Sequence, residues 1–191
     1  MKRLFLASAI VCVSALATPA RAPVNHLTRI ARAAEAQVGV TTIYDPAYRT
    51  LRYPNGDLPI ERGVCADVVV RAFRTIGVDL QVAVHEDMAG HFRDYPAMWG
   101  LRRPDANIDH RRVPNLMRFF ARRGKSLALD APYVPGDVVA WRLPNGLHHI
   151  GVVSTQSAAA AADYLVVHNI GAGARAEDVL RAFRIIGHYR W

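Results

Sequence analysis

The spacing of apolar residues changes once along this chain of 191 residues, near Gly124, and the change limits the folds open to it. Before Gly124, apolar side chains recur every three or four residues, which is typical of amphipathic helices. After Gly124, short runs of β-branched and aromatic residues alternate with turns, which is typical of strands. Short connections between successive strands favour antiparallel pairing. The sequence therefore predicts an α+β domain with its helices first and an antiparallel sheet after them.

The same pattern gives approximate bounds for each element. The expected helices cover residues 27–38, 64–76, 86–95 and 114–123, and the expected strands cover residues 138–141, 149–154, 164–168 and 187–191. Gly39, Gly77 and Gly124 follow three of the helices and are typical stop residues. Residues 44–57 and 96–112 are predicted to form loops, the first because it is rich in Pro, Gly, Asn and Asp.

The N-terminus has the three parts of a secretory signal peptide. Its basic start is followed by an apolar run over residues 4–16 and by the small-residue exit Ala20-Arg21-Ala22. The apolar run is shorter than a membrane-spanning helix needs, and an uncleaved anchor is the alternative. We expect cleavage after Ala22, which would remove Cys12 and leave a single domain over residues 23–191. The predicted product is periplasmic or secreted, without stable insertion in a membrane.

The charge balance bears on the kind of partner. Cleavage after Ala22 would remove Lys2, Arg3 and Arg21 but no acid, and would lower the formal net charge from +8 to +5. A basic balance favours an anionic partner such as cell wall or a membrane surface, and it is also the ordinary result of an Arg-rich composition. The arginines are scattered without interleaved aromatic residues, which argues against nucleic acid. The sequence does not determine the oligomeric state.

Cys65 is the one cysteine that the exported chain would keep, and the apolar spacing places it in the first turn of the helix over residues 64–76. A helix N-terminus lowers the pKa of a thiol, and its unpaired N–H groups can bind an oxyanion. Both properties suit a nucleophile that attacks a carbonyl carbon. The alternative is a structural cysteine that fills the core as a small apolar side chain.

Two histidines on the expected strands can serve this thiol. His149 shares a strand face with Gly151 and Val153, and the missing side chain at Gly151 lets another element pack closely beside it. His168 ends the next strand, where it can orient the His149 ring. Cys65, His149 and His168 would then be nucleophile, base and orienting residue of a triad. The alternative is that both histidines only fill the sheet and satisfy local hydrogen bonds.

A dense polar run lies ahead of the last expected helix. Arg111 or Arg112 can hold a substrate carboxylate in a bidentate fork, or the run can be a loop fixed by its own ion pairs. Tyr44 can offer its hydroxyl to an oxyanion or to the substrate, or it can pack against the core. Six residues are therefore candidates for substrate binding: Tyr44, Asp67, Asp109, His110, Arg111 and Arg112. Asp67 is also expected to pair with Arg71, one helical turn away.

Zinc is the main chemical alternative to a thiol nucleophile. The residues that can ligate it are Cys65, His85, His91, Asp109, His110, His148, His149 and His168. The sequence contains no HExxH or CxxC motif, and the adjacent His148 and His149 point to opposite faces of one strand. We therefore predict neither a metal nor another cofactor.

Six segments resemble a known family over nearly all of residues 39–191. They are Thr42-Ile43-Tyr44-Asp45-Pro46, Gly63-Val64-Cys65-Ala66-Asp67-Val68-Val69, Ile108-Asp109-His110-Arg111-Arg112-Val113-Pro114-Asn115-Leu116, Gly136-Asp137-Val138-Val139-Ala140-Trp141, His149-Ile150-Gly151-Val152-Val153 and His168-Asn169-Ile170-Gly171. The family is the exported bacterial domain-of-unknown-function family 1287. It in turn resembles the NlpC-type peptidases, which are papain-like and cut stem peptides of the bacterial cell wall.

This resemblance implies a papain-like fold with Cys65 opening a helix, His149 in a strand and His168 on the following strand. The Gly136-Asp137 pair also matches the usual entry to the strand before the histidine. Ala66-Asp67 stands where the NlpC type usually has a serine, and the segment between Gly77 and Arg112 is longer than in the compact form. The predicted function is that of a cysteine peptidase or amidase acting on peptidoglycan. A wall-binding module without catalysis and a thiol acyltransferase are the alternatives.

Overall fold

The computed structural model describes residues 25–159 and 163–191, so the predicted signal peptide and Cys12 lie outside the described residues. The predicted α+β class is confirmed. The α-helices are α1 (His26–Glu35), α2 (Cys65–Arg74), α3 (Leu80–His91) and α4 (Val113–Arg122), and the 3-10 helices are η1 (Phe92–Asp94) and η2 (Asp109–Arg111). No helix within the described ranges has the length and apolar character that crossing a membrane requires.

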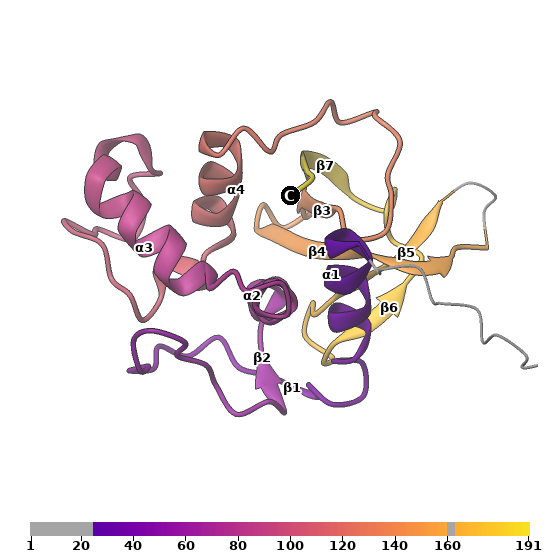
Figure 1. The fold of residues 1–191 in the computed structure, drawn as a ribbon, viewed down its shortest axis with the longest axis horizontal. Coiled ribbons are helices and arrows are strands. Elements are labelled where there is room, and N and C mark those ends of the chain that lie inside the picture. The colour runs from indigo at the N-terminus through magenta and orange to yellow at the C-terminus, as the bar shows by residue number, and fades with distance from the viewer. Residues whose placement is uncertain (1–24, 160–162) are drawn as a thin grey trace, which may run out of the picture.

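The main sheet has five strands in the spatial order β6-β5-β4-β3-β7, and each neighbouring pair is antiparallel (Figure 1). Its strands are β3 (Val138–Arg142), β4 (His148–Ser157), β5 (Tyr164–His168), β6 (Arg175–Glu177) and β7 (Arg184–Tyr189). A separate parallel pair joins β1 (Ile43–Tyr44) to β2 (Arg62–Gly63). The predicted antiparallel sheet is therefore confirmed and extended by β6, and the β1–β2 pair is a second, separate sheet that the sequence did not predict.

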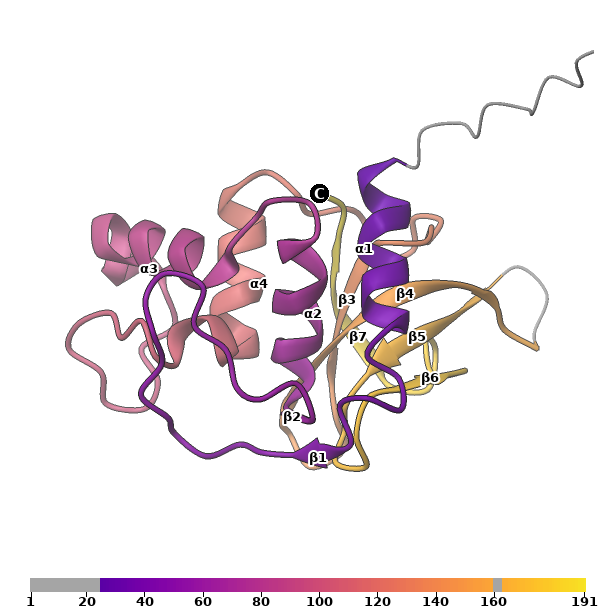
Figure 2. The same cartoon turned by 60° about the horizontal axis from the view of Figure 1, so that its bottom comes forward.

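The helices cover one face of the sheet. Figures 1 and 2 show α1 and α2 against the sheet, with α3 on the far side of α2 and α4. The core between these layers includes Phe73, Phe120 and Ile150, all almost fully buried. Burying one such side chain contributes on the order of 2 kcal/mol. On the opposite face, Trp141 and Leu180 belong to a smaller apolar cluster.

The helix predicted over residues 86–95 has its bounds corrected by the structure. α3 begins earlier, at Leu80, and ends at His91, with η1 following it. Asp79 explains the earlier start, because its side chain accepts a hydrogen bond from the Gln81 N–H and so caps the helix. The apolar spacing before Glu86 is weak, so the capping residue Asp79 marks the start of this helix better than the spacing does.

The predicted ion pair between Asp67 and Arg71 is wrong. Arg71 instead pairs with Asp57, at 2.9 Å from Nη2 to Oδ1, and Asp67 pairs with Arg111 at 2.9 Å. Both Asp67 and Arg71 are buried rather than exposed. A buried charge needs several hydrogen bonds at once, and partners on other segments supply more of them than a neighbour on the same helix can.

Candidate active site

Cys65 is the first residue of α2, and three contacts fix the chain immediately before it. The Val64 N–H donates to Asp67 Oδ2 at 2.7 Å, which satisfies one of the free donors at the helix start. Gly63 pairs with Tyr44 in the small parallel sheet. The Gly63 carbonyl also accepts a hydrogen bond of 3.0 Å from Asn169, which follows β5. The start of the helix is thereby attached to the end of β5.

A buried ion pair lies beneath this turn. Arg111 Nε donates to Asp67 Oδ1 at 2.9 Å, and Arg111 Nη2 donates to Asp67 Oδ2 at 3.0 Å. The same guanidinium donates to the carbonyls of Asp45 and Ala47 at 2.7 and 3.0 Å. Arg111 therefore joins η2, α2 and the loop after β1. Both partners direct their polar atoms to other parts of the protein, which gives this pair a structural role at the helix start.

The two predicted histidines are in direct contact. His149 Nε2 lies 2.8 Å from His168 Nδ1, across the β4–β5 pair. His168 Nε2 lies 2.9 Å from Glu177 Oε2, on β6. Trp141 stacks on the His149 ring with 5.5 Å between centroids. The result is a fixed chain of three polar side chains, each from a different strand.

The His149–His168 hydrogen bond and the nearby Glu177 carboxylate together favour one arrangement of ring protons when both histidines are neutral. The Glu177 oxygen, 2.9 Å from His168 Nε2 but outside hydrogen-bond geometry, favours a proton on that nitrogen by its negative charge. His168 Nδ1 is then an acceptor, and the proton of this bond must come from His149 Nε2. His149 Nδ1 is consequently left with a free lone pair, as a general base requires.

Gly151 allows this close approach of β4 and β5. A Cβ at Gly151 would lie 2.8 Å from Val166 Cγ1, 2.9 Å from the Val167 carbonyl oxygen and 3.2 Å from His168 Cβ. These separations are shorter than ordinary contacts, so any side chain here would push the strand that carries His168 away. The glycine therefore keeps the two histidines within hydrogen-bond distance.

Cys65 and His149 line one cavity of about 330 Å³. Cys65 also lines a second cavity of about 530 Å³. The two cavities share four lining residues: Tyr44, Cys65, Leu147 and His148. Because their linings overlap at the sulfur, we treat them as two arms of one cleft, the small arm and the large arm. Cys65 lies between the arms.

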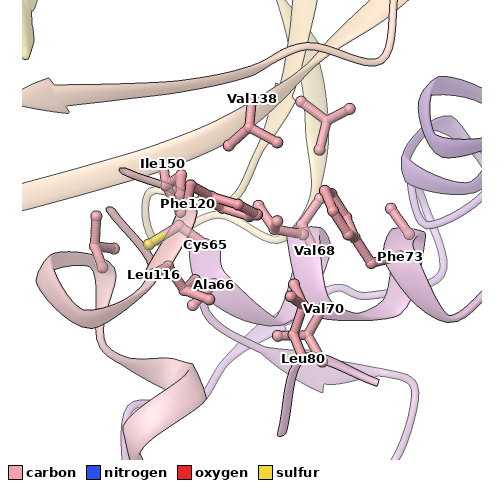
Figure 3. Packing of buried hydrophobic residues seen from close by; sticks show 14 of the residues in the cluster. Cys65, Ala66, Val68, Val70, Phe73, Leu80, Leu116, Phe120, Val138 and Ile150 are labelled. Carbon is pink, nitrogen blue, oxygen red and sulfur yellow. The ribbon is translucent and has the colours of Figure 1, made fainter. Parts of the chain in front are cut away.

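The thiol and the imidazole reach the cleft from different layers. Figure 3 shows the Cys65 sulfur pointing away from Val68 and Phe73, at the edge of the buried cluster. His149 lies on the Trp141 side of the sheet, near the turn between β3 and β4. No hydrogen bond between Cys65 Sγ and the His149 ring occurs among the residues that the structure describes.

Burial keeps both groups neutral in the resting protein. It raises the pKa of the Cys65 thiol to about 12, and it lowers the pKa of His149 to about 3, with the nearby His168 acting in the same direction. The backbone N–H groups of Ile150 and Ala66 work against the rise in the thiol pKa without overcoming it. The lowering that a helix start alone predicts is thus outweighed by loss of solvent.

The remaining candidate substrate-binding residues divide into two groups. Tyr44 and Arg112 line the cleft, and the pKa of Tyr44 is raised first by burial and then by the nearby Cys65 sulfur. Asp109 and His110 are buried and line neither arm. Asp109 accepts a hydrogen bond from the Asp105 N–H, and burial lowers the pKa of His110 to about 4.

Metal ligands do not gather in this region. Within residues 25–159 and 163–191, no three His, Cys, Asp or Glu side chains are grouped closely enough to hold a metal ion.

Glu177 is the site residue that the sequence reasoning missed. Strand β6 has only three residues, so its alternation is too short to recognise. In the β5–β6 register, Glu177 pairs with Val166, which is two residues from His168 and therefore on the same face. Glu177 lies between the last two expected strands, and its place beside His168 depends on a strand pairing that the sequence did not reveal.

Fold and site together define an α+β domain in which a helix-start cysteine and His149 border one cleft, with His168 and Glu177 in line behind His149. The chain matches the model of the family described as a domain of unknown function, DUF1287, over residues 31–191, and it belongs to that family. It is also 56% identical over 170 residues to the uncharacterized protein YijF of Escherichia coli (strain K12). That match covers 87% of this chain and 82% of the relative.

Proposed function

We propose that the protein is a cysteine hydrolase of the papain-like, NlpC-like type that cleaves an amide bond. The observation that carries the proposal is the shared cavity of Cys65 and His149, with His168 hydrogen-bonded to the His149 ring and Glu177 paired by charge with His168 behind it. A structural cysteine needs no cavity, and structural histidines need no ordered chain that leaves one nitrogen free.

The first step uses a neutral pair rather than a preformed thiolate. As Cys65 Sγ attacks the substrate carbonyl, His149 Nδ1 accepts the thiol proton, and the C–S bond forms as the carbonyl π bond opens. The imidazolium that results is stabilised through His168 by the Glu177 carboxylate. A substrate that fills the cleft brings the thiol, the carbonyl and the imidazole together. The hydrogen bond between Cys65 Sγ and His149 Nδ1 would form at this stage.

The developing oxyanion has donors close to the sulfur. The Cys65 and Ala66 N–H groups belong to the first helical turn, whose donors lack intrahelical acceptors. Tyr44 lines the same cleft as Cys65, and its hydroxyl is a further candidate donor. Donors already in place at an oxyanion contribute about 10²–10³-fold each to the rate.

The intermediate then collapses in two stages. The C–N bond breaks, His149 returns its proton to the departing amine, and an acyl-thioester stays on Cys65. Water attacks this thioester with His149 again as base, the C–S bond breaks, and the proton returns to the thiolate. The products are a carboxylic acid and an amine, and the site is neutral again. No cofactor takes part in this sequence.

We propose peptidoglycan stem peptides as the substrate, and a periplasmic or secreted location after cleavage behind Ala22. The cleft extends on both sides of Cys65, as an internal bond of a peptide requires. The basic composition suits an anionic wall. The test is incubation of the purified protein with muropeptides, with the products identified by mass. Cleavage that is lost in Cys65→Ala supports the proposal.

A wall-binding module is the second candidate, and the raised pKa of Cys65 is the observation that favours it. Such a module would bind muropeptides with equal affinity before and after Cys65→Ala and would release no product. Transfer of the acyl group to an added amine instead of to water would indicate the acyltransferase alternative. It would be seen as a new amide in the same mass spectra.

A further inference from the structure

The two arms of the cleft differ in charge. The large arm contains three arginines, and no Asp or Glu is part of its lining. The small arm contains no Arg, Lys, Asp or Glu, and its remaining side chains are mostly apolar, among them Leu143, Ile170 and Phe183. A substrate that crosses Cys65 therefore meets a cationic surface on one side and an uncharged one on the other.

Two of the three arginines make no hydrogen bond to a carboxylate among the described residues. Arg111 is neutralised by Asp67 beneath the turn, as described above. Arg112 Nη1 is buried without a hydrogen-bond partner among the described residues and forms a long ion pair of 3.8 Å with Asp109 Oδ1. Arg142 uses Nη1 to donate to the Gly146 carbonyl at 2.8 Å, which leaves its charge without a carboxylate partner among those residues.

Arg112 is also held in a defined position. Its guanidinium carbon lies 4.2 Å from the centre of the Trp99 ring, in a cation–π contact. Trp99 itself lines the large arm and is 48% exposed, so the stacked pair forms part of the cleft wall. A guanidinium that is stacked and short of partners is prepared to bind a carboxylate in the plane of its N–H groups.

We propose that the large arm binds a carboxylate of the substrate through Arg112 and Arg142, so that the preferred substrate is a peptide with an acidic group on one side of the scissile bond. This inference builds on the proposed hydrolase and adds the class of peptide and the side on which its charge lies. Tyr44 and Trp99 would contact the peptide around that carboxylate, and the small arm would receive an uncharged segment.

The test uses two stem peptides that differ in one group, a free carboxylate or the corresponding carboxamide next to the cleaved bond. For the wild-type protein, we expect kcat/KM to be about 10- to 100-fold higher for the acid than for the amide, as expected for charge-assisted hydrogen bonds. Arg112→Gln should remove most of this preference by slowing the acid alone, and Arg112→Lys should keep a part of it. Arg118→Gln removes the same charge from an exposed position outside both arms and should change nothing.

A binding measurement separates this inference from the proposed reaction. Cys65→Ala is titrated with the same two peptides, so that carboxylate preference is read without turnover. Tighter binding of the acid that is lost in Arg112→Gln supports the anionic arm even where no cleavage occurs. Equal affinity for acid and amide, or equal loss for both peptides in Arg112→Gln with an unchanged melting temperature, overturns it.

Discussion

At the scale of single residues, the site is built to hold neutral groups. Cys65 and His149 both lose solvent on folding, and this loss disfavours the thiolate and the imidazolium alike. Attack by the thiol with proton transfer to His149 creates a negative oxyanion and a positive imidazolium at once. Backbone N–H donors stabilise the oxyanion, and the His168–Glu177 pair stabilises the imidazolium. The site therefore develops charge only during the reaction, when a substrate has completed the cleft.

Resting thiol reactivity follows from this arrangement. Because the pKa of Cys65 is about 12, the thiolate fraction at neutral pH is very small. We expect the rate of alkylation by iodoacetamide, followed by intact mass, to rise steadily through the range from about pH 8 to 11. A rate that levels off below pH 7 would mean that the resting sulfur is already ionised.

Glu177 should matter through the histidines rather than through the substrate. Glu177→Ala removes the acceptor that fixes the His168 proton, so we expect kcat to fall about 10-fold with KM little changed. The kcat of Glu177→Gln, which keeps an acceptor oxygen, should lie between those of the wild-type protein and Glu177→Ala. Asp178→Ala is the control, since Asp178 is exposed on the adjoining position. Unchanged kcat in Glu177→Ala, or a change confined to KM, would contradict this role.

The residue scale also shows what the sequence could not predict. Arg111 and Arg112 are neighbours in one polar run, and the sequence predicted either as a carboxylate ligand. The 3-10 turn over Asp109–Arg111 directs Arg111 inward to Asp67, while Arg112 reaches the cleft beside Trp99. The choice depends on partners more than 40 residues away in sequence for Arg111, and no local pattern contains that information.

At the scale of elements, the fold depends on close contact between particular segments. The β4–β5 pair is the clearest case, because Gly151 admits His168 where a Cβ would not fit. Gly151→Ala should cost about 1–3 kcal/mol of unfolding free energy and should lower activity by more than that loss explains, since the His149–His168 bond is displaced. Denaturant unfolding and kcat/KM give the two readouts.

Gly90→Ala provides the matched control for this prediction. Gly90 lies within α3, and a Cβ there meets nothing within 4 Å. Because alanine is the better helix former, the change should stabilise the protein by about 0.5–1 kcal/mol without affecting activity. Equal effects of the two substitutions on stability would show that β4 and β5 are not closely packed at Gly151.

The start of α2 depends on the buried pair between Asp67 and Arg111. Removing one partner leaves an uncompensated buried charge, so Asp67→Ala should destabilise the protein by about 3–5 kcal/mol in denaturant unfolding. The double change Asp67→Leu with Arg111→Met should recover much of that loss. The exposed pair between Arg181 and Asp163 is the comparison, and Arg181→Ala should cost less than about 1 kcal/mol. A small effect of Asp67→Ala would mean that the pair is not structural.

Helices and strands were predicted correctly where the apolar period was clear and the element was long enough to show it. The helices near Cys65 and Val113 and the strand over Tyr164–His168 lie close to their expected bounds. Prediction failed for the two-residue strands β1 and β2 and the three-residue strand β6, because these exist through pairing rather than through local propensity. Two of the site's supports, the Tyr44–Gly63 pairing and Glu177, lie on such strands.

At the scale of the whole molecule, buried histidines make stability depend on pH. The pKa of His110 is about 4 in the folded protein and about 6.5 when unfolded, so the unfolded state binds more protons between these values. Stability from this group is complete above about pH 6.5 and is lost as the pH falls toward 4. Burial raises the pKa of Asp109, which acts in the opposite direction over the acid range.

A variant isolates the histidine contribution from that of the carboxyls. We expect the melting temperature of the wild-type protein to fall between about pH 6.5 and 4, and His110→Gln to show a shallower fall over the same range. Both proteins are measured by thermal unfolding followed by circular dichroism. The same slope in both proteins would show that His110 is not buried as a neutral group.

The central claim is that Cys65 forms a covalent acyl intermediate after His149 takes its proton. The most direct measurement is intact-protein mass spectrometry after rapid acid quenching of the purified protein mixed with wall stem peptides. We expect an adduct on Cys65 equal in mass to the acyl half of the cleaved peptide, absent in Cys65→Ala and strongly reduced in His149→Ala. Product that accumulates equally with Cys65→Ala, without any adduct on the wild-type protein, would contradict it.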